Sequence, residues 1–377
     1  MANCNSEIAN GKLGRLLTVI YLNNNATTSL ASEVLKAMSA PVADKDETIR
    51  RARESVAVLL GANDPQEVFF TSGGTESNSL AILEALKIDP QKSHVITTRV
   101  EHETITTLCK DLEQTGNRVT WLNINEKGTL DMDQLRDSLD EDTAVISIMM
   151  ANHETGVIFP VADIAQIVKE HSNALFHVDG ACAAGKVAIN LKNTAIDLFS
   201  ISAHKFHGPK GIGALYVRNG VNLPSISSRE MNENFRDITG LGTAAELAGD
   251  LSAMEHIRAL RTRMETAILS SIPNTSLNGT VDELSRLPNT SNISFENTNG
   301  EMILSRLDDE GICVSTRSAC NSETRSVSPV LQAMNIPYSK AMGSISFSLG
   351  RENTDAEIDV VIEKLPLIIT EIKNFDR

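Results

Sequence analysis

The chain has 377 residues, of which 41% are hydrophobic and 22% are charged, and its formal net charge at pH 7 is −15. This length is sufficient for two domains, and the composition is ordinary for a globular protein. The acidic balance argues against nucleic acid as a partner, and no apolar run approaches the length of a membrane span. Residues 1–22 lack a basic start followed by an apolar core, so we expect no secretory signal.

The five cysteines favour a reducing compartment. Their number is odd, their spacing forms no disulfide framework, and no CxxC pair indicates zinc. Cys109 and Cys313 have apolar neighbours in the sequence, so we interpret them as inert core thiols. We therefore expect a cytoplasmic protein without disulfides and without a metal site.

Short β-rich runs alternate with helical patterns through the middle of the chain. The predicted strands are 67–72, 94–100, 144–150, 174–180 and 197–203, and the predicted helices are 78–87, 103–116 and 161–171. This alternation requires crossover connections, which make neighbouring strands parallel and place helices on both faces of the sheet. We therefore predict an α/β fold with a mainly parallel central sheet, whose ligands bind at the carboxyl ends of the strands.

A helical pattern over residues 244–271 is predicted to connect this sheet to a second unit. Beyond it, strand-like and helix-like segments alternate at 292–297, 301–311, 344–350 and 356–375. Mixed elements of this kind predict a smaller α+β domain. We set the large domain at 20–250 and the small domain at 251–377, with residues 1–19 extended or packed on the small domain.

One lysine stands where a predicted buried strand ends. Lys205 follows the strand at 197–203, lies between His204 and His207, and precedes a turn rich in glycine and proline. Burying an ammonium group is costly unless it loses its proton or gains a partner. For this residue alone, a lysine that extends from an ordinary turn into solvent is the alternative interpretation.

Polar residues also follow the other predicted strands. Gly74 and Thr75 open a helix after the first strand, where they either cap the helix or bind an anion with its free N–H groups. His102 follows the second strand, Asn152 the third and Asp179 the fourth. The histidines have no partner at the i, i+4 spacing of a helical metal site.

Pyridoxal phosphate is the one chemistry that uses all of these groups together. Its aldehyde needs an amine with a lowered pKa, for which Lys205 is the candidate. Asp179 would keep the pyridine nitrogen protonated, and His102 is placed to stack on the ring. The candidates for binding the phosphate are Gly74, Thr75, Ser202 and His204.

The sequence resembles the NifS/IscS-type cysteine desulfurases, which are fold-type I pyridoxal-phosphate enzymes of the class-V aminotransferase group. The resemblance runs in collinear order from about Tyr21 to the C-terminus. Its segments are YLNNNATT (21–28), FTSGGTESNS (70–79), VEHET (100–104), ANHETG (151–156), FHVDGACAAGK (176–186), SAHKFHGPKGIG (202–213), STRSACNS (315–322) and ISFSLGRENTDAEID (345–359).

The resemblance implies roles for the residues that match the family's motifs. Lys205 would form the Schiff base, Asp179 would contact the pyridine nitrogen and His102 would stack on the ring. Asn152 would lie near the cofactor's phenolic oxygen and the substrate. Thr243 would reach the phosphate in a partner subunit, which implies a homodimer with shared sites.

The resemblance also implies the reaction, in which L-cysteine becomes L-alanine and a persulfide forms on Cys320. Arg351 would hold the substrate carboxylate with its bidentate fork. The run 314–328 has little to bury, so we expect a mobile surface loop that carries Cys320 to the substrate. The persulfide would pass to a sulfur-acceptor protein, as in iron–sulfur cluster assembly.

The sequence departs from the family pattern in three places, and these departures leave two alternatives open. The segment 39–54 is shorter, Cys182 replaces a glutamine, and the region 225–245 is altered. The first alternative is a divergent pyridoxal-phosphate C–S lyase or another β- or γ-eliminating enzyme of the same fold. The second is a catalytically degenerate protein that binds a sulfur-transfer partner.

Overall fold

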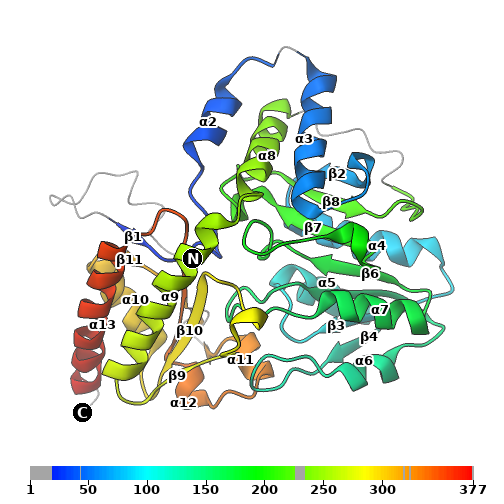
Figure 1. Cartoon of the computed structure of the whole chain (residues 1–377). Coiled ribbons are helices and arrows are strands. Elements are labelled where there is room, and N and C mark those ends of the chain that lie inside the picture. The colour runs from blue at the N-terminus through cyan, green and yellow to red at the C-terminus, as the bar shows by residue number, and fades with distance from the viewer. Residues whose placement is uncertain (1–18, 43, 226–233, 317–318, 322–323, 376–377) are drawn as a thin grey trace.

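The larger unit contains a seven-stranded sheet with the strand order β2-β8-β7-β6-β5-β3-β4 (Figure 1). The computed structural model describes residues 19–42, 44–225, 234–316, 319–321 and 324–375. From β4 to β7 neighbouring strands are parallel, whereas β8 is antiparallel to both of its neighbours, which confirms the mainly parallel sheet. The strands are β2 (Val68–Thr71), β3 (His94–Thr98), β4 (Arg118–Leu122), β5 (Thr143–Met149), β6 (Leu175–Asp179), β7 (Leu198–Ser202) and β8 (Gly213–Val217).

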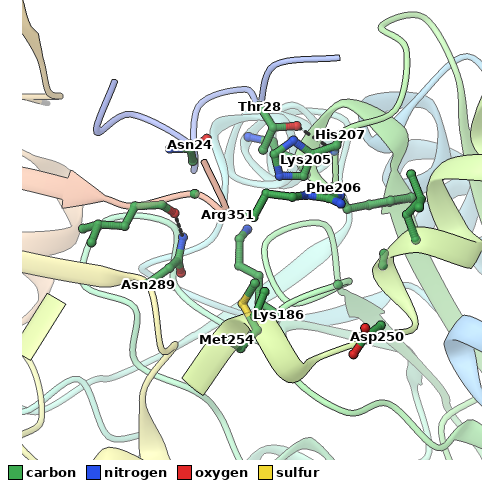
Figure 2. A pocket seen from close by; sticks show the side chains of 16 residues that line it. Asn24, Thr28, Lys186, Lys205, Phe206, His207, Asp250, Met254, Asn289 and Arg351 are labelled. Atoms are coloured by element: carbon green, nitrogen blue, oxygen red, sulfur yellow. Dashed lines mark hydrogen bonds between the residues drawn. The ribbon is translucent and has the colours of Figure 1, made fainter. Parts of the chain in front are cut away.

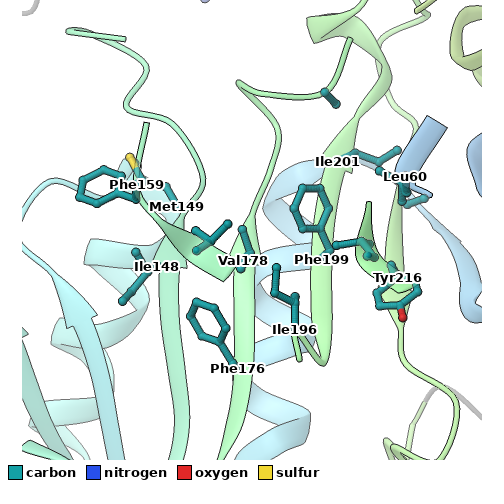
Figure 3. Packing of buried hydrophobic residues seen from close by; sticks show 14 of the residues in the cluster. Leu60, Ile148, Met149, Phe159, Phe176, Val178, Ile196, Phe199, Ile201 and Tyr216 are labelled. Atoms are coloured by element: carbon teal, nitrogen blue, oxygen red, sulfur yellow. The ribbon is translucent and has the colours of Figure 1, made fainter. Parts of the chain in front are cut away.

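Both faces of the central strands are buried, because successive side chains point to opposite sides. Val145 packs with the apolar residues of α4 and α5, whereas its neighbour Ile146 belongs to a separate cluster on the other face. Phe199 lies in that second cluster (Figure 3). The predicted helices on both faces are therefore confirmed. The helices of this unit are α2 (Ser32–Ser39), α3 (Lys45–Leu60), α4 (Gly74–Ile88), α5 (Glu103–Gln114), α6 (Met132–Ser138), α7 (Val161–His171) and α8 (Phe235–Ala248).

The continuous helix predicted over 244–271 is wrong, because the structure divides it into α8 and α9 (Ser252–Ser271). Gly249 caps the end of α8, and the Asp250 carboxylate accepts a hydrogen bond of 2.9 Å from the Ser252 N–H at the start of α9. An aspartate just before a helix favours its start, because its carboxylate accepts a hydrogen bond from a free N–H of the first turn. The apolar periodicity continues across the break and concealed it in the sequence.

The smaller unit has an antiparallel sheet in the order β14-β10-β9 and its own apolar core. Ile20 and Leu22 pack into this core, because β1 (Ile20–Tyr21) pairs with β11 (Ile312–Cys313). The division of the chain near residue 250 stays a prediction, because this core is separate but Val330 and Leu331 pack into the core of the larger unit. The other elements of this unit are β9 (Thr275–Leu277), β10 (Thr290–Phe295), α10 (Gly300–Asp309), α11 (Pro329–Ala333), α12 (Tyr338–Ala341), β14 (Ser344–Ser348) and α13 (Asp355–Phe375).

The thiols differ in part from the sequence expectation. Cys109 is buried and free, as expected, whereas Cys313 is buried and disulfide-bonded. The expectation of an inert thiol at Cys313 is therefore wrong, because sequence spacing does not reveal pairings made through space. Within the described residues, no helix has both the length and the apolar character needed to cross a bilayer.

We predict that Gly180→Ala destabilises the protein, because Gly180 follows Asp179 at a point of close packing. A Cβ atom there would lie 2.0 Å from the Phe199 ring, so the strand end or the ring must move. Overpacking of this kind costs about 1–3 kcal/mol. Thermal unfolding measures the loss, with Gly249→Ala as the control, because its Cβ would approach no closer than 3.3 Å. Equal melting temperatures for the two variants would contradict this packing.

Candidate active site

Lys205 ends a short 3-10 turn (Ala203–Lys205) directly after β7. Its Nζ donates hydrogen bonds to the carbonyl oxygens of Asn25 at 2.5 Å and Ala26 at 3.0 Å. The segment that supplies these oxygens is fixed by Thr28, whose N–H and hydroxyl both donate to the carbonyl of His204. Backbone carbonyls from the N-terminal segment therefore hold the amine at the carboxyl end of the sheet.

Asp179 ends β6, the neighbour of β7, and its side chain is buried. One carboxylate oxygen accepts a hydrogen bond of 2.8 Å from the Asn78 amide, and the other accepts one of 2.9 Å from the Ala181 N–H. The sequence analysis did not single out Asn78, although it lies in the FTSGGTESNS segment. Its Oδ1 is buried without a hydrogen-bond partner in the described structure, so its amide group is oriented by Asp179 alone.

The start of α4 lies against the end of β7. Gly73 has φ 145°, a conformation that favours glycine, and a Cβ on Gly74 would lie 3.5 Å from the Ser202 side chain. Thr75 follows in the first turn of the helix, whose free N–H groups and dipole attract an anion. The structure thus brings together Gly74, Thr75 and Ser202, and it places His204 in the turn that follows Ser202.

His102 caps the start of α5, next to Thr75. Its ring Nδ1 lies 3.0 Å from the Thr104 hydroxyl, which lies 3.4 Å from the Thr75 hydroxyl. The ring also meets the His153 ring edge to face, with 5.5 Å between centroids. His102 is therefore oriented by its neighbours at the edge of the sheet where Asp179 and Lys205 lie.

Asn152 is buried in the turn after β5, and its side chain bonds both within that turn and to the loop after β3. Its amide donates to the carbonyl of Val100, while its Oδ1 accepts from Glu154 and from both the N–H and the hydroxyl of Thr155. These contacts rigidify the loop that faces His102.

Glu101 is a buried acid that the sequence analysis did not single out. Its Oε1 accepts hydrogen bonds from the Thr98 hydroxyl at 2.7 Å and the Met149 N–H at 3.1 Å. Burial, with a smaller contribution from the charge on Asp179, raises the pKa of Glu101 to about 8. Glu101 is therefore neutral at pH 7 and adds no negative charge to this edge of the sheet.

Arg351 follows β14 and lines the same cavity as Lys205 (Figure 2). The cavity lies where the two units meet, and Asn24, His207 and Lys186 also line it. It offers about 50 Å³ of space that water could occupy. The predicted substrate arginine and the predicted Schiff-base lysine therefore face one space, although they are far apart in the sequence.

Two predicted residues lie in other elements, and within the described residues the Thr243 side chain makes no hydrogen bond to this cluster. Thr243 lies in α8 and donates its hydroxyl to the Thr239 carbonyl, one turn earlier. Cys320 lies in β12 (Ala319–Asn321), which pairs with β13 (Thr324–Ser326) in a short antiparallel hairpin. Its side chain lies outside the described structure.

The expectation that the run 314–328 has little to bury is wrong at its two ends, whereas its mobility stays a prediction. Besides the hairpin, Val314, Val327 and Ser328 are buried, and the Ser328 hydroxyl donates a 2.6 Å hydrogen bond to the Glu154 carboxylate. These burials anchor both ends of the segment. The sequence concealed the anchoring because Ser328 is a polar residue whose partner lies in a distant loop. Within the described residues, no group of three or more metal-ligating side chains gathers.

The chain matches a known family and several relatives over most of its length. Residues 19–361 match the family described as aminotransferase class-V. A cysteine desulfurase from Trichormus azollae is 45% identical over 95% of this chain and 94% of its own length, and the cysteine desulfurase NifS of Azotobacter vinelandii is 41% identical over 94% of each. A solved NifS-like protein superposes with a TM-score of 0.85 and 33% identity, covering 94% of this chain and all of its own.

We predict that the buried histidines reduce stability at acidic pH. His177 bonds to the hydroxyls of Ser147 and Ser200 at 2.9 and 2.8 Å, and burial lowers its pKa to about 4 from 6.5. Between pH 6.5 and pH 4 the unfolded chain binds a proton at His177 and the folded chain does not. The free energy of unfolding is therefore highest above about pH 6.5 and falls towards pH 4. His177 should account for roughly 2–3 kcal/mol of that fall.

Unfolding midpoints measured across this pH range test the prediction. His177→Gln should lower the overall stability but reduce the slope between pH 6.5 and 4, because the titrating ring is gone. An unchanged slope in the variant would contradict the assignment of His177 as a neutral buried ring.

Proposed function

Because this chain belongs to the class-V aminotransferase family, we propose that it is a pyridoxal-phosphate-dependent cysteine desulfurase that converts L-cysteine to L-alanine. The observation that carries the proposal is the convergence of Lys205, Asp179 and His102 at one edge of the sheet. Arg351 faces the cavity that Lys205 lines. A primary amine, a buried carboxylate, an oriented ring and a carboxylate-binding arginine are the groups that this reaction requires.

The residues present fit the cofactor. Lys205 would hold it covalently, Asp179 would pair with its ring nitrogen, and His102 would lie against the ring. The start of α4 would bind the phosphate through its N–H groups, with the hydroxyls of Thr75 and Ser202 as further donors. Gly73 and Gly74 leave room for this approach, because neither carries a Cβ atom.

Burial also fixes the protonation state of the imidazole beside the phosphate position. The pKa of His204 is lowered to about 4 by burial and by the neighbouring charges of Lys205, Lys210 and Lys186. The His204 ring is therefore neutral at pH 7, and it bonds through Nδ1 with the Thr27 hydroxyl at 3.2 Å. It would offer a hydrogen bond to the phosphate beside the free N–H groups of the helix N-terminus.

When bound, the cofactor supplies an electron sink for cleavage at the substrate's α-carbon. Arg351 would orient the amino acid by its carboxylate. Once released from the cofactor, the Lys205 amine would take the α-proton, and the carbonyls of Asn25 and Ala26 would hold it as an ammonium.

Cys320 would receive the sulfur atom. Its thiolate attacks the sulfur of the substrate, so an S–S bond forms as the Cβ–S bond breaks. The bonding pair stays on Cβ, which takes a proton and becomes the methyl group of alanine. The persulfide on Cys320 would then pass to a sulfur-acceptor protein, with iron–sulfur cluster assembly as the proposed destination.

We further propose a cytoplasmic homodimer. Leu35 in α2 and Val58 in α3 are 55% and 80% exposed, which supports a covered face on these helices. Thr243 lies in α8, which packs against both α2 and α3. A second copy of the chain on this face would bring Thr243 near the partner's phosphate position.

The decisive prediction concerns Cys320. Purified wild type should release alanine from L-cysteine in the presence of a reductant, and Cys320→Ala should lower this rate roughly 100-fold, because no thiolate accepts the sulfur. Cys109→Ala removes a free thiol that does not line the cavity, so it is the control for loss of a thiol and should retain the rate. Alanine and bound sulfur are quantified by mass spectrometry.

Each of the other results would favour one of the alternatives. Pyruvate formed equally well without Cys320 would favour an eliminating enzyme of the same fold. A protein that stays colourless after addition of pyridoxal phosphate would favour a catalytically degenerate binding protein. Full turnover by Cys320→Ala would contradict the persulfide mechanism.

A further inference from the structure

Lys186 is a second buried lysine near the site, and no step described above uses it. It lies in the turn that follows β6 and is only 7% exposed. Its Nζ donates one hydrogen bond of 2.9 Å, to the carbonyl oxygen of Cys182. An ammonium group has three donors, so this contact leaves donor capacity at a buried position.

The turn is held in place by close packing. Gly185 has φ 73°, and a Cβ there would lie 3.0 Å from the Cβ atoms of both Phe206 and Ala248. The backbone beside Lys186 is therefore pressed between the loop that carries Lys205 and the end of α8. This packing fixes the direction in which the Lys186 side chain extends.

That direction is into the cavity between the two units. Lys186, Lys205 and Arg351 all line it, and Figure 2 shows the Lys186 side chain extending towards the Lys205–Phe206 loop and Arg351. The charges of Arg351 and Lys186 both lower the pKa of His207, after the larger effect of burial. Both cations therefore lie within electrostatic range of one ring in the cavity wall.

The cavity wall has an excess of positive charge. Asp250 is the one acid among its described lining residues, and it forms no ion pair with Lys186 or Arg351 within the described structure. Its carboxylate instead accepts the Ser252 N–H at the start of α9. Burial lowers the pKa of Lys186 to about 8, which leaves most of the amine protonated at pH 7. An unpaired buried cation such as Lys186 is costly unless an anion binds beside it, and the partly exposed Arg351 adds a second positive charge to the same cavity.

We propose that Lys186 is a substrate-binding residue whose ammonium group, beside Arg351, binds the α-carboxylate of the amino-acid substrate. This inference rests on the proposed function and adds a second cation to the carboxylate subsite. About 50 Å³ of water-accessible space has room for several water molecules and therefore for a carboxylate group. Two cations that converge on one carboxylate would make the site select amino acids over the corresponding amines.

The test compares two ligands of the holoenzyme that differ only in the carboxylate, L-cysteine and cysteamine. Absorbance titration gives the dissociation constant of each ligand for wild type, Lys186→Met and Lys186→Gln. Both variants should bind L-cysteine roughly 10- to 100-fold more weakly, since a hydrogen bond to a charged group is lost. Their affinity for cysteamine should stay within about twofold of wild type.

A matched control and the kinetics complete the test. Lys192→Met removes an exposed lysine from a nearby turn and should change neither dissociation constant. In turnover of L-cysteine, the Lys186 variants should raise KM far more than they lower kcat, because the lost contact forms on binding.

The outcomes separate this inference from the proposed function. Wild-type affinity for L-cysteine in both Lys186 variants would overturn the inference, while alanine production continues to support the function. An equal loss for cysteine and cysteamine would also overturn it, because Lys186 would then act on the cofactor or on Lys205. Absence of alanine production by wild type would instead refute the proposed function.

Discussion

The hydrogen bonds between the Lys205 amine and the carbonyls of Asn25 and Ala26 are the contacts on which the site depends. They join the end of β7 in the larger unit to a segment whose start, at Ile20 and Leu22, is packed in the core of the smaller unit. The two units are thereby held around one cavity, which both Lys205 and Arg351 line. A reactive amine needs this arrangement, because carbonyl oxygens orient it without the permanent charge of a carboxylate.

Burial controls charge around that amine. Glu101, His204 and His207 are titratable, yet their shifted pKa values leave all three neutral at pH 7. The Asn78 amide fixes the Asp179 side chain at this edge, while the cations face the cavity. The site thus keeps negative charge where a pyridinium would lie and positive charge where a carboxylate would lie. The two kinds of charge are separated because Asp179 is buried at the end of β6, whereas Lys186, Lys205 and Arg351 line the cavity between the units.

Local patterns in the sequence were sufficient for the sheet and for most of the residues that cluster at its edge. Continuous apolar runs, such as those of β5 and β7, predicted buried strands of a parallel sheet. The polar residue that follows each strand indicated the site. The break at Gly249 was missed because apolar periodicity continued through it. Asn78, Asn25 and Lys186 were missed because their roles depend on contacts with residues distant in the sequence, as does the burial of Ser328 against Glu154.

The central claim is that Lys205 is the amine that carries the cofactor. The most direct measurement reduces the purified coloured enzyme with borohydride, digests it and maps the pyridoxyl group by mass spectrometry. The account predicts one labelled peptide, modified at Lys205, and no label at the neighbouring buried amine of Lys186. A label at Lys186 or at any other residue, or no labelled peptide at all, would contradict it.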